Sequence, residues 1–130
     1  MEQLLCYFPD RSDPMLAAVR RAALPLKVRL RAAAPEQAGQ KLGYLLGRKS
    51  FEEQTGDAPV LPDPILVLDG FTGARMDALL RALARARVPR TVFKAAVTAT
   101  NVDWTLYALW QELKKEREAL ERGEEPVHGA

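Results

Sequence analysis

The sequence has few of the residues on which cross-links and common catalytic sites depend. Its 130 residues include one cysteine, Cys6, and one histidine, His128. A single cysteine cannot form an internal disulfide, which favours a reducing, cytoplasmic location. A nucleophilic cysteine needs a neighbouring base. Because Cys6 falls in an apolar segment and His128 in the last residues, we expect no Cys–His catalytic pair.

Long apolar runs and ligand-binding motifs are also missing. No stretch approaches the roughly 18 apolar residues that cross a bilayer, and residues 1–6 lack the basic start of a signal peptide. There is no phosphate-binding loop, dinucleotide-binding glycine motif, paired metal-binding histidines or serine elbow. We therefore expect no membrane association, no cofactor and no metal. These absences favour a non-catalytic protein without excluding an enzyme.

What is present is enough apolar material for one folded domain. Hydrophobic residues make up 48% of the chain, which is typical of a globular protein. We expect a single α/β domain over residues 1–123 and a disordered tail over 124–130. The net charge is only +2, but the charges are segregated. Residues 11–49 carry nine Lys/Arg against two acids, whereas residues 51–70 carry five acids and no base.

The second half of the sequence resembles the first. Residues 65–110 align with residues 2–47 at a constant offset of 63, without a gap, and predicted strands and helices coincide in order. This pattern predicts an internal repeat, with repeat one at 2–50, repeat two at 65–123, and an exposed acidic, proline-containing connector at 51–64.

Apolar runs and alternating residues predict four strands and four helices. The strands are expected near 4–8, 26–31, 65–68 and 91–97, and the helices near 15–24, 35–46, 73–88 and from about 101 onward. The first strand of each repeat is apolar throughout, as in central strands, and the second carries charges, as at sheet edges. The sequence therefore predicts a four-stranded sheet of order 2-1-3-4, with the direction in which the repeats meet left open.

A motif near the end of the domain resembles a known family. The residues in question are Lys94, Ala95, Thr98, Asn101, Trp104, Leu109, Glu112 and Leu113. Their spacing is similar to the KAxxTxxNxxWxxxxLxxEL signature of a family of small bacterial proteins described only as a domain of unknown function. The resemblance covers about residues 65–115. It implies a bacterial α/β protein and carries no activity or catalytic residue.

Polar residues at the expected strand ends form one candidate site. Parallel strands commonly bind ligands at their carboxyl ends, and a helix start favours an anion there. The candidate ligand-binding residues are Asp69, Lys94, Thr98, Thr100 and Asn101. A structural alternative explains the same segment: Thr100 and Asp103 could form a capping box, with Asn101 as another cap and Trp104 beneath the corner. Trp110 is expected on a different side of the helix from Trp104.

Two further sets of residues admit functional interpretations. Asp10 and Asp13 could join Asp69 around a cation, although aspartates beside turns more commonly form turns and caps. Basic residues on the outer strands could instead contact nucleic-acid phosphates; they are Lys27, Arg29, Arg31, Arg90 and Lys94. Solvated, edge-protecting charge is the structural alternative.

Three functions remain open. The leading hypothesis is a non-catalytic module that acts through protein contacts, a homodimer included, or through a small regulatory ligand. The second is an RNA- or DNA-binding protein that uses its basic strand faces. The third is a small hydrolase or transferase with its site in the crevice at the strand ends.

Overall fold

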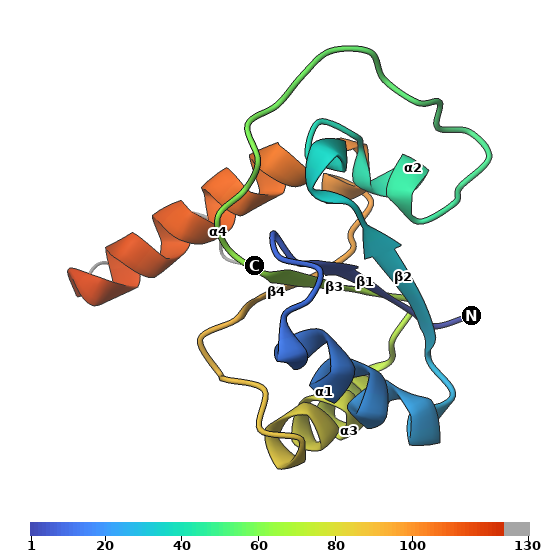
Figure 1. The fold of residues 1–130 in the computed structure, drawn as a ribbon, viewed down its shortest axis with the longest axis vertical. Coiled ribbons are helices and arrows are strands. Elements are labelled where there is room, and N and C mark those ends of the chain that lie inside the picture. Colours follow the sequence, from blue (N-terminus) through green and yellow to red (C-terminus); the bar gives the residue numbers. More distant parts are fainter. Residues whose placement is uncertain (124–130) are drawn as a thin grey trace.

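The fold is a four-stranded mixed sheet, seen in a computed structural model that describes residues 1–123 (Figure 1). The strands are β1 (Gln3–Tyr7), β2 (Arg29–Ala33), β3 (Ile65–Asp69) and β4 (Phe93–Ala96), in the order β2-β1-β3-β4. β1 pairs parallel with β2, and β3 pairs parallel with β4. The predicted order is confirmed, and the two halves meet antiparallel through β1 and β3.

Helices cover both faces of this sheet. α1 (Pro14–Ala23) and α3 (Gly73–Arg85) lie side by side on one face, and α2 (Leu42–Leu45) and α4 (Leu106–Glu121) lie on the other (Figure 1). Side chains alternate across β1, so Leu4 and Cys6 join the core beneath α1 and α3, whereas Leu5 and Tyr7 join the core beneath α2 and α4. The apolar β1 and β3 are covered on both faces, as their sequences predict.

Side-chain caps explain where the long helices begin. The Asp13 carboxylate accepts from the Met15 amide at 2.9 Å, with Pro14 at the first position of α1. Thr105 caps α4 by accepting from the Ala108 amide at 3.0 Å. The predicted start of α4 near Asn101 is therefore wrong, because residues 101–103 form a separate 3-10 turn.

The expected second strand and second helix are also displaced. β2 runs from Arg29 to Ala33, and Lys27 precedes it in a left-handed conformation with φ of 58° after a 3-10 turn. The predicted strand at 26–31, with Lys27 on it, began three residues too early. The predicted helix at 35–46 is reduced to a 3-10 turn (Pro35–Gln37) and the short α2. Glycines in this segment lower its helical preference.

The two halves share one order of strands and helices, but their elements are not spaced by a constant 63 residues. That offset equates Leu5 with Leu68, which lie on opposite faces of the sheet. β1 and β3 begin 62 residues apart, and the helix caps Lys41 and Thr105 lie 64 apart and pair with each other. The ungapped register is therefore wrong, whereas the shared element order is as expected. Descent from a duplicated unit stays a prediction.

The connector at 51–64 is tied to the domain at several points. The Tyr7 hydroxyl donates to the Leu61 carbonyl at 3.1 Å and accepts from the Leu61 amide at 3.0 Å. Gln40 and Gln54 exchange two further hydrogen bonds. Leu61 is buried, so the expectation that the connector is exposed is wrong at this residue. Residues 124–130, where the sequence predicts a disordered tail, lie outside the described residues. No helix in the part of the chain that is described is long and apolar enough to span a membrane.

Candidate docking face

The antiparallel junction separates the two sets of strand carboxyl ends. Tyr7, at the carboxyl end of β1, pairs with Ile65, at the start of β3, and Gln3 pairs with Asp69. Asp10 and Asp13 therefore follow one end of the sheet and Asp69 lies at the other. Residues 1–123 contain no group of three or more His, Cys, Asp or Glu side chains able to hold a metal. The cation cluster considered from the sequence is not assembled.

Asp69 is a buried residue whose carboxylate is already paired. Its oxygens accept from Gln3 Nε2 at 3.1 Å and from an Arg48 guanidinium nitrogen at 2.9 Å. Gln3 is held in turn by Arg31, which donates from Nε to Gln3 Oε1. These side chains link β2, β1 and β3 across one end of the sheet. Asp69 therefore stabilises the junction of the two halves.

Asn101 is buried and bonded to the backbone of its own corner. Its Oδ1 accepts from the Thr98 amide at 2.8 Å, and its Nδ2 donates to the Ala96 carbonyl at 2.9 Å. The Thr98 hydroxyl accepts from the Asn101 amide at 2.9 Å. Thr100 is exposed and makes no side-chain capping bond, so the capping box with Asp103 is wrong. The bonds of Asn101 hold the turn that follows β4, which we call the β4 corner. Asn101 therefore has a structural role, but it does not cap a helix as the sequence suggested.

Lys94 points its ammonium toward backbone carbonyls at the start of β4. Its Nζ donates to the Val92 carbonyl at 3.1 Å and lies 3.4 Å from the Arg90 carbonyl. Burial, followed by the nearby charges of Arg117 and Arg90, lowers the pKa of Lys94 below its ordinary value. Lys94, Asn101 and Asp69 thus each bond to their own partners within the fold. Asp69 ends β3 and the Thr98 corner follows its parallel neighbour β4, and a ligand site shared by the five candidates stays a prediction.

The basic residues of the outer strands also lie apart. Arg29 and Arg31 are on β2, and Arg31 shares the face of Gln3 and α2. Lys94 is on β4, where it pairs with Leu66 of the core beneath α1 and α3. β2 and β4 are the two opposite edges of the sheet. The strands therefore do not present one continuous basic surface, and Lys27 and Arg90 lie just before them.

The two tryptophans pack on the same side of the molecule. Trp104 and Trp110 both contact the core beneath α2 and α4, and Trp110 Nε1 donates to Asp63 at 2.8 Å. The expectation that they face different sides is wrong, because Trp104 precedes α4 and does not follow its helical spacing.

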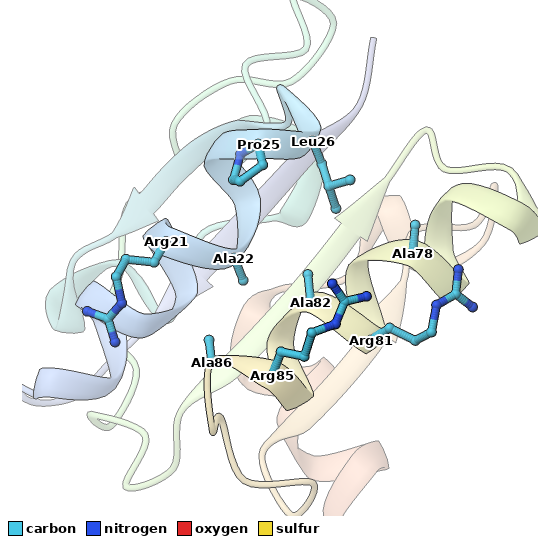
Figure 2. A pocket seen from close by; sticks show the side chains of 9 residues that line it. All are labelled: Arg21, Ala22, Pro25, Leu26, Ala78, Arg81, Ala82, Arg85 and Ala86. Carbon is cyan, nitrogen blue, oxygen red and sulfur yellow. The ribbon is translucent and has the colours of Figure 1, made fainter.

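A shallow groove runs between α1 and α3, on the face opposite α2 and α4. It encloses about 390 Å³, and Figure 2 shows alanine side chains between the two helices. The small residues on its floor are Ala22, Ala78, Ala82 and Ala86. Pro25 and Leu26 close one end, next to Leu24, which is 78% exposed. Small side chains at this spacing leave room for another element to approach both helices closely.

Three arginines surround this apolar floor: Arg21 from α1, and Arg81 and Arg85 from α3 (Figure 2). Within residues 1–123, the side chain of none of the three forms an ion pair or a hydrogen bond. Among the described residues, no acidic one lines the groove. The α1/α3 groove, as we call the region lined by these residues, is therefore both apolar and positively charged.

The sequence contained part of the signal for this groove. Arg81 and Arg85 are four apart on one helix, and so are Ala78, Ala82 and Ala86. The contribution of α1 could not be anticipated, because it requires α1 and α3 to be neighbours across two halves of the chain. Cys6 lies in the core beneath α1 and α3. Burial raises the pKa of the Cys6 thiol to about 12, which disfavours a reactive thiolate.

The fold and this face define a small α/β protein with a basic, alanine-lined groove. Residues 64–120, from β3 through most of α4, match a family model described as a domain of unknown function (DUF3783). The resemblance indicated by the signature from Lys94 to Leu113 is thereby confirmed. Searches of the curated proteins and of the solved structures returned no match. In this chain the signature contains the Thr98–Asn101 corner and the core residue Leu109.

Proposed function

We propose that this protein is a non-catalytic module that binds an acidic amphipathic helix of a partner protein in the α1/α3 groove. The observation that carries the proposal is the set of three arginines without partners in residues 1–123 beside an apolar floor. Unpaired charges of one sign attract a partner of the opposite sign and fix its orientation. The apolar floor also removes apolar surface of the partner from water, and this burial stabilises the complex in addition to the charge attraction.

A helix is the partner element that fits this floor. Helices pack with their axes about 8–10 Å apart, and small side chains at the contact allow the shorter distances. Ala78, Ala82 and Ala86 follow one face of α3, and Ala22 faces them from α1. An apolar helix face can therefore rest on the alanines while its flanking glutamates reach the arginines, as in other helix-in-groove interactions.

A nucleic acid would use the same charges differently. Single strands bind through aromatic side chains on which bases stack, in addition to basic residues. The described residues that line the groove are alanine, proline, leucine and arginine, and none of them is aromatic. This composition favours a protein partner over RNA or DNA. We include a cytoplasmic location in the proposal, on the ground that Cys6 is a free thiol.

The experiment is a binding titration with a defined probe. A fluorescent synthetic helix, with glutamates along its edges and leucine and alanine on its contact face, is titrated with the protein and followed by anisotropy. The same measurement is made with Arg81→Glu/Arg85→Glu and with the matched control Arg29→Glu/Arg90→Glu, which changes the charge equally outside the groove. We expect the groove variant to bind about tenfold or more weakly, a loss of at least ~1.4 kcal/mol, and the control to bind nearly as wild type.

A lysine version of the probe and a mixed-sequence oligonucleotide provide the other arms. The proposal requires the acidic probe to bind more tightly than either, with an affinity that falls as salt is raised. Equal loss of binding in both charge-reversal variants would contradict a specific groove. So would tighter binding of the oligonucleotide, or failure of the acidic probe to bind.

A further inference from the structure

The outer edge of β2 has backbone groups available for pairing. The Arg29 amide donates to the carbonyl of Glu2, the residue just before β1, at 3.1 Å. Because backbone groups alternate in direction along a strand, the amides and carbonyls of Leu30 and Ala32 point away from β1. In the described chain no strand pairs with this edge, and neither residue makes a backbone hydrogen bond outside the sheet. Ala32 is exposed.

A small pocket lies beside this edge, at the carboxyl ends of β1 and β2. It encloses about 240 Å³ between the end of the sheet and α1. The apolar residues that line it are Cys6, Phe8, Leu16, Ala32 and Ala33. Ala32 belongs both to this lining and to the outer strand β2, so the pocket adjoins the strand edge.

Two cations lie at this pocket. Arg11 comes from the turn before α1 and Arg20 from the last turn of α1, and both contribute to the lining. Neither forms an ion pair or a hydrogen bond through its side chain within residues 1–123. The pocket therefore combines an apolar interior, two unpaired guanidinium groups and an adjacent strand edge.

We propose that the β2 edge binds the C-terminal segment of a partner protein as an added strand. The last side chain of that segment, an apolar one, enters the pocket, and its terminal carboxylate lies between Arg11 and Arg20. The C-terminal residue of a chain carries both an apolar side chain and a carboxylate. It can therefore match the apolar lining and the two arginines at the end of β2. Strand addition supplies main-chain hydrogen bonds, and the pocket selects the residue at the end.

Charge also argues against a second copy of this chain at the same edge. Two β2 strands paired antiparallel would bring the arginines at positions 29 and 31 of one copy opposite those of the other. Like charges directly opposite each other destabilise a strand pair. A foreign C-terminus instead brings the charge that the pocket lacks.

The test uses three synthetic peptides of alternating threonine and valine. One ends in leucine with a free carboxylate, one is the same peptide as its C-terminal amide, and one is an amide with a glutamate inside the strand. Titration calorimetry should give the free-acid peptide an affinity at least about tenfold higher than the plain amide. Arg11→Ala/Arg20→Ala should bring the two to equal affinity.

A proline substitution separates strand addition from simple charge attraction. Ala32→Pro removes an amide that points away from β1, and such positions tolerate proline on edge strands. Ala96→Pro is the matched control, because the Val97 amide donates to Leu68 and the amide of Ala96 therefore points outward from β4. We expect Ala32→Pro to abolish binding of the free-acid peptide and Ala96→Pro to leave it unchanged, with both variants retaining the wild-type circular dichroism spectrum.

Amide hydrogen exchange gives a readout that does not require a variant. In the complex with the free-acid peptide, the amides of Leu30 and Ala32 should exchange at least about tenfold more slowly. Equal binding of acid and amide peptides would overturn the terminal-carboxylate assignment. Tighter binding of the internal-glutamate peptide would overturn that assignment as well. Strand addition would be overturned by an equal loss of binding in both proline variants, or by unchanged exchange at Leu30 and Ala32.

Discussion

Replacement of Asn101 by alanine distinguishes a structural corner from a ligand site. The side chain supplies two hydrogen bonds, from the Thr98 amide to Oδ1 and from Nδ2 to the Ala96 carbonyl. Each net hydrogen bond contributes about 0.5–1.5 kcal/mol, and a buried group left without a partner costs about 1–3 kcal/mol. Asn101 is only 8% exposed, so we expect Asn101→Ala to lower the free energy of unfolding by about 2–4 kcal/mol.

Urea unfolding followed by circular dichroism measures this change. The matched control is Thr100→Ala, because Thr100 is the exposed neighbour with no side-chain capping bond. It should alter stability by less than about 0.5 kcal/mol. If Asn101→Ala were as stable as wild type, the hydrogen bonds of the corner would not stabilise the fold and the structural explanation would be refuted.

Two further predictions concern buried groups of β1. Tyr7→Phe removes both hydrogen bonds with the Leu61 backbone, and urea unfolding should show a loss of about 2–4 kcal/mol; a loss below about 0.5 kcal/mol would contradict the anchoring of the connector. The raised pKa of Cys6, about 12 against an ordinary 9.0, makes its contribution to stability complete below pH 9 and progressively lost as the pH rises toward 12. The stability difference between wild type and Cys6→Ala should therefore fall by up to about 1.4 kcal/mol per pH unit in this range, and a difference independent of pH would show that the thiol ionises equally in the folded and unfolded chains.

The sheet order was predictable because its cause lies in local composition. β3 is apolar at four successive positions, Ile65 to Leu68, and central strands of this kind are covered on both faces. The charged residues of β2 mark an edge by the same reasoning. The direction in which the halves meet has no such local signature. It depends on how β1 and β3 pair, which is a tertiary property.

Two local errors have specific physical causes. The alternation from Leu26 to Arg31 has the period of a strand, but the left-handed conformation at Lys27 ends the preceding turn and delays the start of β2. Thr100, Asn101 and Thr105 are all suitable capping residues, and Thr105 is the one that caps α4. A side-chain type indicates that a cap is near, whereas its position depends on which amide the side chain reaches.

The candidate site was less predictable than the fold. Polar residues after strands suggested a ligand crevice, yet Asp69 and Asn101 are engaged by Arg48 and by the β4 corner respectively. The α1/α3 groove joins Arg21 to Arg81, which are sixty positions apart in the sequence. Such a surface depends on how a helix of one half packs against a helix of the other. The residue pattern within either half does not indicate that packing.

Mapping the bound acidic helix by amide chemical shifts is the most direct test of the central claim, that the α1/α3 groove is the docking site. Isotope-labelled protein is titrated with the glutamate-bearing synthetic helix, and each amide is followed by two-dimensional NMR. The largest changes should fall at residues 21–26 and 78–86. Changes centred on residues 98–101 and Asp69, or no saturable change anywhere, would contradict the account.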